Sequence, residues 1–166
     1  QMCIRDRLDG DNDITLELGE NHVRIDFGNI VFTSKLIDGK FPEYGRVIPS
    51  DTSNHLTAEK DTLKTSLQRT AILSNEKYRG IRLIIKVDEM ILQAHNPEQE
   101  EAEETLDIRY SGSDIEVGFN VTYLIDALAA INSQEVRLSM VDGNSSCLIC
   151  DPNNEDTKFV VMPMRL

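Results

Sequence analysis

The chain has 166 residues, of which 40 % are hydrophobic and 5 % aromatic, and it has no tryptophan. This is enough for one medium domain, or for one domain and a fragment of another, with an aliphatic core. Its net charge of −12 disfavours nucleic-acid binding, because affinity for DNA comes largely from Lys and Arg, although one local basic face would still permit it. No apolar run approaches the length of a membrane-spanning helix, so no membrane association is expected.

The N-terminal quarter of the chain predicts three strands. Residues 1–7 share no pattern with the rest of the chain, and we treat them as a non-native scar outside the fold. Three segments then alternate apolar and polar residues with the period of a half-buried strand: Asp13–Leu18, His22–Phe27 and Ile30–Leu36. The glycines and prolines of residues 38–51 predict an extended connector and a domain boundary.

The remainder repeats one order of elements twice. The first copy has a strand near His55–Ala58, a helix near Lys60–Leu73, and strands at Ile81–Val87, Met90–Asn96 and Glu103–Tyr110. The second has a strand at Ile115–Phe119, a helix at Val121–Ile131, and strands at Val136–Val141, Ser146–Cys150 and Lys158–Met162. This duplicated β-α-β-β-β unit predicts an α+β fold with antiparallel sheets and helices on one face.

Local signals support both predicted helices and one turn. The first helix should bury Leu63, Leu67 and Ala71, and the second should bury Val121, Leu124, Ile125, Leu128 and Ala129. Asn120 is placed to cap the second helix. The pair Asp142-Gly143 predicts a hairpin turn.

The cysteines give little indication of chemistry. Cys3, Cys147 and Cys150 are an odd number with no disulfide framework, which fits a reducing, cytosolic compartment. Cys147 and Cys150 form a Cys-x-x-Cys motif, but positions three apart on a strand point to opposite faces. We therefore expect no metal site and no redox function at these cysteines.

An acidic run and an apolar end are the remaining unusual features. The run consists of Glu98, Glu100, Glu101, Glu103 and Glu104. It is either a solvated face or a set of paired carboxylates for catalysis, and a small hydrolase using residues such as Asp107 and Glu116 stays open from these residues alone. The last seven residues, 160–166, are apolar except for Arg165, so they either finish an edge strand or form a patch that binds a partner.

Five ordered blocks carry a family resemblance: residues 32–44, 72–80, 96–104, 118–123 and 160–166. Together they closely resemble the bacterial sliding clamp, the beta subunit of DNA polymerase III, over about residues 8–166. The resemblance implies that the chain is a C-terminal fragment of a subunit with three domains. Two such subunits close into a ring around duplex DNA. Residues 8–50 would then end the middle domain, and residues 51–166 would be the complete third domain.

The resemblance also implies three sets of site residues. The family's apolar groove for partner peptides corresponds here to Pro42, Arg46, Val47, Tyr78, Asn120, Tyr123, Ser146, Val160, Met162, Pro163, Met164, Arg165 and Leu166. The dimer interface corresponds to Ile72, Leu73, Glu98, Glu100, Glu101, Glu103 and Glu104. The DNA-facing lining corresponds to Lys60, Lys64 and Arg69, whose other interpretation is ordinary solvated side chains.

The function implied is that of a replication processivity factor, with no catalytic residues and no cofactor. Its partners would be duplex DNA, bound without sequence preference, the alpha subunit of the polymerase, the clamp loader, other clamp-binding peptides and a second subunit. A peptide-binding domain that never meets DNA is the rival interpretation.

Overall fold

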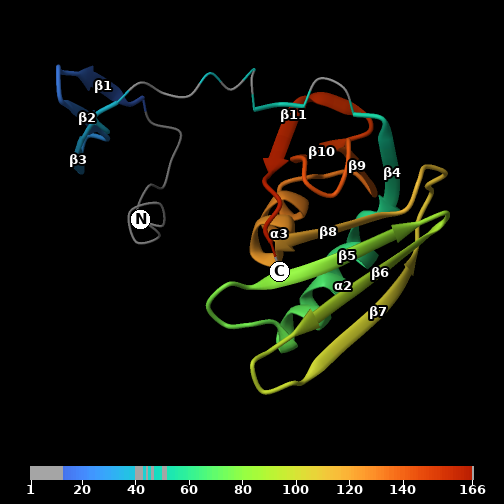
Figure 1. Cartoon of the computed structure of the whole chain (residues 1–166). Helices are drawn as coiled ribbons and strands as arrows, with labels where there is room; N and C mark the ends of the chain where they lie inside the picture. The colour runs from blue at the N-terminus through green and yellow to red at the C-terminus, as the bar shows by residue number, and fades with distance from the viewer. Residues whose placement is uncertain (1–12, 40–42, 44, 46, 50–51, 166) are drawn as a thin grey trace. The chain divides into compact units, whose positions relative to one another are not determined.

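The computed structural model of the chain describes residues 13–39, 43, 45, 47–49 and 52–165. The chain divides into a smaller unit within residues 1–42 and a larger unit within residues 43–166. Figure 1 labels the elements of both units.

The smaller unit contains one three-stranded antiparallel sheet. Its strands β1 (Thr15–Leu18), β2 (His22–Asp26) and β3 (Val31–Lys35) pair in chain order. The three strands confirm the alternation seen in the sequence, each within two residues of its expected bounds. Ile14, Leu16 and Leu18 are all more than half exposed on this unit.

The larger unit contains the two predicted β-α-β-β-β copies. The first consists of β4 (Asn54–Glu59), α2 (Lys60–Thr70), β5 (Gly80–Lys86), β6 (Glu89–His95) and β7 (Glu101–Asp107). The second consists of β8 (Ile115–Asn120), α3 (Val121–Ala129), β9 (Glu135–Met140), β10 (Cys147–Asp151) and β11 (Asn154–Val161). A short 3-10 turn, η2 (Ala71–Leu73), continues α2.

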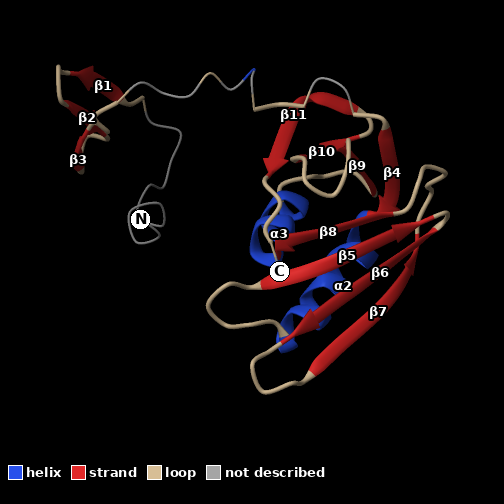
Figure 2. Ribbon diagram, viewed as in Figure 1, coloured by secondary structure: helices blue, strands red, loops and turns tan. Residues whose placement is uncertain are grey.

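The two copies exchange their first strands. One antiparallel sheet has the order β11-β10-β9-β4 and the other has the order β7-β6-β5-β8, so each takes three strands from one copy and one from the other. Figure 2 shows the two helices, in blue, packed beside these sheets. Neither copy can complete its sheet alone, which makes the larger unit one folding body.

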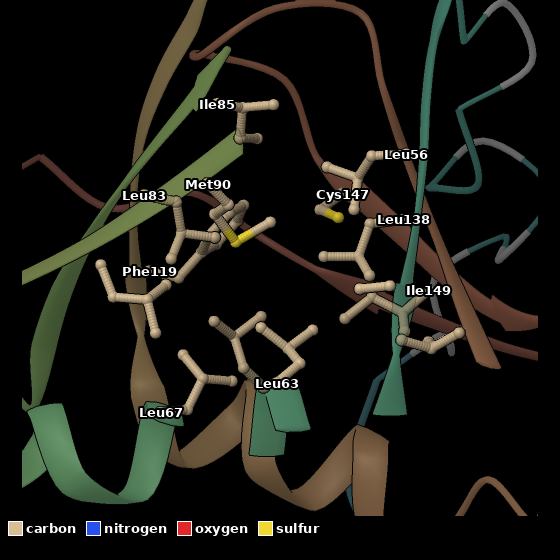
Figure 3. Close-up of a cluster of buried hydrophobic side chains, with 14 of the residues drawn as sticks. Leu56, Leu63, Leu67, Leu83, Ile85, Met90, Phe119, Leu138, Cys147 and Ile149 are labelled. Atoms are coloured by element: carbon tan, nitrogen blue, oxygen red, sulfur yellow. The ribbon is translucent and has the colours of Figure 1, made fainter. Parts of the chain in front are cut away.

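An aliphatic core joins the sheets and the helices. Figure 3 shows Leu63 and Leu67 of α2 directed between the two sheets. Leu83, Met90 and Phe119 approach them from one sheet, and all five side chains are at most 2 % exposed. Mainly aliphatic side chains thus fill the space between the layers, with Phe119 as the one aromatic ring among these five.

The helix starts follow local capping rules. Asn120 caps α3 as expected, its Oδ1 accepting a hydrogen bond from the Thr122 amide at 2.9 Å. Glu59 caps α2 in the same way, accepting from the Asp61 and Thr62 amides at 3.2 and 2.5 Å. These bonds lower the pKa of Glu59, with the Thr62 contact as the largest cause.

Two details of the prediction were wrong, a buried position of the second helix and the length of one turn. Helix α3 buries Ala127 rather than Ala129, because position 127 lies three residues after buried Leu124 on the same face. Cys147 and Cys150 are both buried, at 0 % and 7 % exposure, which is compatible with positions on opposite faces of a strand that is covered on both sides.

The turn at Asp142-Gly143 is also longer than a two-residue hairpin. Residues 141–146 connect β9 to β10, and the Asp142 carboxylate accepts from the Asn144 amide and the Ser145 hydroxyl at 2.8 and 2.7 Å. Gly143 lies so close to β8 that a Cβ there would overlap the Glu116 carbonyl oxygen. Glycine is needed here for close approach and not for a two-residue turn.

Candidate functional site

The C-terminal segment crosses from one sheet of the larger unit to the other. Strand β11 pairs with β10 up to Val161, and the chain then leaves the sheet. The Met164 amide donates to the carbonyl of Gly118 on β8 at 2.8 Å, which holds the segment against the second sheet. Met162 remains 61 % exposed, and Ser146 Oγ lies 3.0 Å from its sulfur.

A loop and a helix start lie beside this segment in the hydrogen-bond network. The Asn120 side-chain amide donates to the Tyr78 carbonyl at 3.3 Å, and the Val121 backbone amide donates to the Arg79 carbonyl at 2.8 Å. These bonds fix the loop that carries Tyr78 to the start of α3. Tyr78 and Tyr123 are 56 % and 60 % exposed, so both rings are available to a partner.

A surface pocket joins part of the predicted groove to residues that the sequence did not indicate. Its volume is about 290 Å³, and its predicted members are Tyr78, Met164 and Arg165. Asn75, Gly80, Gln93 and His95 complete the wall. Gln93 and His95 lie on β6, about 70 residues before the C-terminal segment, so only the tertiary structure brings them to it.

The other predicted groove residues have separate outcomes. Val47, Val160 and Pro163 are half-buried and do not line that pocket. Pro42, Arg46 and Leu166 lie outside the described residues. Asn120 is taken up by its capping bond and its bond to Tyr78, so its first role is to position the loop.

Four of the seven residues assigned to the dimer interface lie together on the larger unit. Ile72, Leu73, Glu98 and Glu100 line a single hollow of about 500 Å³. Ile72 is 77 % exposed, a large apolar side chain left in water. Beside them, β7 is an edge strand of its sheet, so its outer backbone groups are free to pair with another strand.

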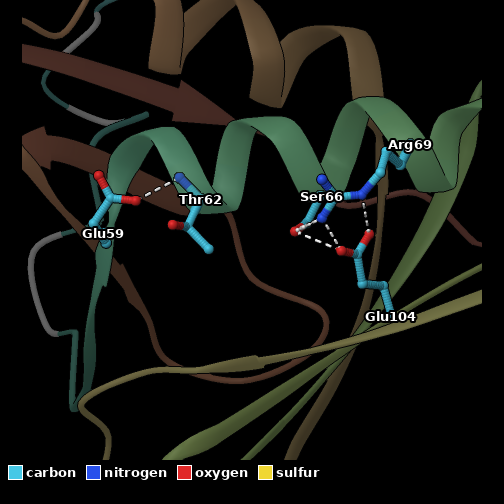
Figure 4. Close-up of polar contacts among 5 residues, drawn as sticks. All are labelled: Glu59, Thr62, Ser66, Arg69 and Glu104. Atoms are coloured by element: carbon cyan, nitrogen blue, oxygen red, sulfur yellow. Dashed lines mark hydrogen bonds and ion pairs between the residues drawn. The ribbon is translucent and has the colours of Figure 1, made fainter.

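The acidic run divides between two faces instead of forming one row. Glu101 and Glu103 are exposed, whereas Glu104 lies on the opposite face of β7 beneath α2. Figure 4 shows that the Glu104 carboxylate accepts from Ser66 Oγ at 2.9 Å and forms an ion pair with Arg69. The Arg69 hydrogen bond holds the pKa of Glu104 below its usual value.

The three predicted DNA-facing cations are not equivalent. Arg69 is paired with Glu104, and Lys60 Nζ donates to the Ile131 carbonyl at 3.1 Å just beyond α3. Lys60 is also 3.5 Å from Asp61 and its side chain is only 16 % exposed. Lys64 is half-buried and has no ion pair with any described residue. A cationic lining would therefore depend mainly on Lys64.

The two carboxylates considered for a hydrolase lie far apart, and the described residues form no group that could hold a metal ion. Strands β7 and β8, which carry Asp107 and Glu116, are separated by two strands, so the carboxylates lie roughly 14 Å apart at least, beyond the reach of a carboxylate pair. Glu116 is moreover 2.9 Å from Arg82. Within residues 13–39 and 52–165, no three His, Cys, Asp or Glu side chains converge on a point. Burial raises the pKa of the Cys147 thiol to about 12, which keeps it protonated.

Comparison with known proteins identifies the family. A model of the DNA polymerase III beta subunit, C-terminal domain, matches residues 45–165, and a model of the central domain of that subunit matches residues 4–43. The chain belongs to the DNA polymerase III beta subunit family. The resemblance carried by the five sequence blocks and the expected α+β clamp fold are both confirmed.

Sequence relatives and solved structures agree with this assignment. The chain is 48 % identical over 157 residues to the beta sliding clamp of Escherichia coli strain K12, covering 95 % of this chain and 43 % of the relative. The DNA polymerase III subunit beta of Pseudomonas aeruginosa superposes with a TM-score of 0.85 at 47 % identity, covering 95 % of this chain and 44 % of that one. A sliding clamp of Bartonella birtlesii, bound to griselimycin, gives a TM-score of 0.85 at 34 % identity, with 100 % and 44 % covered.

The match is partial in length. The chain spans less than half the length of the curated relatives, 42 % of the beta sliding clamp of Pseudomonas putida for example.

No described helix has the length and apolar character needed to cross a lipid bilayer.

Proposed function

We propose that this chain supplies part of a bacterial sliding clamp, a non-catalytic processivity factor of DNA replication in the cytoplasm. In this proposal a ring of two subunits encircles duplex DNA without reading its sequence. The polymerase alpha subunit, the clamp loader and other partners attach through short peptides. Tethering raises the effective concentration of polymerase at its template, so no single contact has to be tight.

The position of the C-terminal segment is the observation that best supports the proposal. Met164 is brought to Tyr78 in the wall of a surface pocket, and Met162 lies exposed beside Ser146, although both residues follow a strand of the other sheet. Methionine side chains adapt to varied ligands, which suits a groove that serves several partners. The clamp of Bartonella birtlesii was solved with griselimycin bound, so a member of this family holds a ligand.

Two further assignments complete the proposal. Residues 8–50 would end a middle domain and residues 51–166 would form a third domain. The division of the chain into two compact units, between residues 42 and 43, supports two domains. The edge of β7, together with Ile72 and Leu73, would receive a basic strand edge of the second subunit, since Glu101 and Glu103 remain exposed beside it. The lining toward DNA would rely on Lys64, because Lys60 and Arg69 are held by other groups.

A peptide titration tests the groove. A labelled peptide with Gln, Leu and Phe anchors is titrated into the 166-residue chain, into the double variant Met162→Ala, Met164→Ala, and into Val87→Ala. Val87 is 59 % exposed on the β5–β6 turn and is outside the groove, so it controls for loss of surface apolar area. The methionine variant should weaken binding about tenfold or more, since apolar anchors dominate such interfaces. Equal affinity of all three proteins would refute the groove assignment.

A further inference from the structure

The pocket beside the C-terminal segment differs in charge from the two neighbouring hollows. Glu101 and Glu103 line the hollow on the outer face of β6 and β7, and Glu98 and Glu100 line the hollow beside Ile72. The wall of the pocket at Tyr78 and Met164 has no carboxylate among the described residues, in a chain with 29 acidic residues. Arg82 and Lys77 offset part of the negative charge of the two hollows, but carboxylates outnumber cations in both, whereas no described residue of this wall is acidic.

Three polar side chains of this wall can donate hydrogen bonds to a ligand, whereas the side-chain nitrogen of Gln93 already donates to Glu103 at 2.7 Å. Arg165 is exposed and makes no ion pair with any described residue, so its guanidinium is free for a ligand. The Asn75 Oδ1 already accepts from the amides of Lys77 and Tyr78 at 3.0 and 3.1 Å, which leaves this side chain its Nδ2 donors. His95 adds a ring nitrogen, although Glu101 is its neighbour on β7 and competes for it.

Tyr78, Gly80 and Met164 form the apolar part of the wall, which is continuous with the proposed groove. Tyr78 and Met164 belong to both, so a peptide lying over Met164 leads directly into this pocket. A volume of about 290 Å³ is at the lower end for ligand pockets and suits one or two side chains rather than a separate molecule. A glutamate fits this environment, with its methylene groups against Tyr78 and Met164 and its carboxylate at Arg165.

We propose that this pocket is a specificity site for an acidic residue that flanks the apolar anchors of partner peptides, with Arg165 binding its carboxylate. The proposal rests on the proposed peptide groove and adds to it a selection by charge. Partners with a flanking carboxylate would be favoured over partners with the same apolar anchors and a neutral flank.

A set of matched peptides tests this proposal on the 166-residue chain. The core peptide with Gln, Leu and Phe anchors is extended on one flank or the other with two residues, either Glu-Glu, Gln-Gln or Leu-Leu. On the flank that reaches the pocket, the peptide with Glu-Glu should bind about three- to fivefold more tightly than the peptide with Gln-Gln. This is the range expected for a partly exposed ion pair. That ratio should fall to about one in Arg165→Gln, whereas Lys86→Gln, an equal charge change at the far end of β5, should keep it.

Each other outcome has a definite meaning. If the core peptide binds and its acidic and neutral extensions bind equally, the acidic specificity is wrong and the groove stands. If the preference for Glu-Glu over Gln-Gln survives in Arg165→Gln, or is lost equally in Lys86→Gln, it comes from the overall electrostatic field of the protein. Either result would overturn the site at Arg165. Tighter binding of Leu-Leu than of Glu-Glu would make the pocket an apolar one. Binding of no peptide at millimolar concentration would overturn both this inference and the groove.

Discussion

The two β-α-β-β-β copies of the larger unit have the same order of elements but end differently. The first copy ends in β7, an edge strand whose exposed face carries Glu101 and Glu103. The second ends in β11, also an edge strand, which runs into the apolar segment of Met162 and Met164. A repeated scaffold thus presents two unlike edges, one acidic and one that continues into an apolar segment.

The helices of the two copies differ in a similar way. Helix α2 carries Lys60, Lys64 and Arg69, whereas α3 has no Lys or Arg. Both helices nevertheless bury the same kind of aliphatic face. The comparison shows that burial constrains one face of each element and leaves the opposite face free to diverge in function.

The largest expected effect tests whether the two copies share one core. Leu67→Ala in α2 and Leu128→Ala in α3 each remove a side chain that is 1 % exposed, and each should cost about 2–5 kcal/mol of unfolding free energy. Because the copies exchange strands, urea denaturation followed by circular dichroism should remain a single transition for the larger unit in both variants. A separate early transition in one variant would mean that the copies fold independently.

A second prediction concerns the loop that only the second copy packs onto β8. Gly143→Ala should lower the unfolding free energy by about 1–3 kcal/mol, because the new methyl group overlaps the Glu116 carbonyl and forces a shift. Asn144→Ala in the same loop is the control, since the Asn144 side chain is exposed and its backbone amide makes the observed bond to Asp142. Equal stability of both variants, measured by thermal unfolding, would show that the loop moves away at little cost.

A third prediction concerns the ion pair that only the first copy places between its helix and its edge strand. The folded-state pKa of Glu104 is lowered, so its contribution is present above the unfolded pKa near 4.5 and is lost as pH falls through the folded value. Glu104→Gln should therefore reduce the melting temperature by about 2–4 °C at pH 7, with the difference shrinking below pH 4.5.

Glu101→Gln is the charge-matched control for this measurement. It removes an exposed carboxylate from the opposite face of the same strand and should leave the melting temperature nearly unchanged. A pH-independent difference between Glu104→Gln and the unchanged chain would assign the effect to packing instead of charge.

The smallest expected effect distinguishes the cations of α2. In binding to duplex DNA over a salt series, Lys64→Gln should reduce the slope of log K against log salt by about 0.9, the value for one phosphate contact. Lys60→Gln should change the slope less, because the Lys60 ammonium is held at the Ile131 carbonyl. The same slope in both variants would remove Lys64 from the proposed lining.

The sequence itself determined the elements and their order. Two-residue alternation located the strands, helical spacing located Leu63 and Leu67, and Asn120 marked the start of α3, because these are local properties of the chain. The five sequence blocks also determined the family. Tertiary structure alone decided that each sheet takes its fourth strand from the other copy, since pairing depends on contacts between distant residues.

The site shows the same division. Tyr78, Met164 and Arg165 were named from sequence, whereas Gln93 and His95 join them only because β6 lies beside the end of the chain. Likewise, the charges of Arg69 and Glu104 are visible in the sequence, but their pairing depends on which face of β7 lies under α2. Residue type and local period are written along the chain, whereas a pocket or an ion pair depends on which distant faces the shared core brings together.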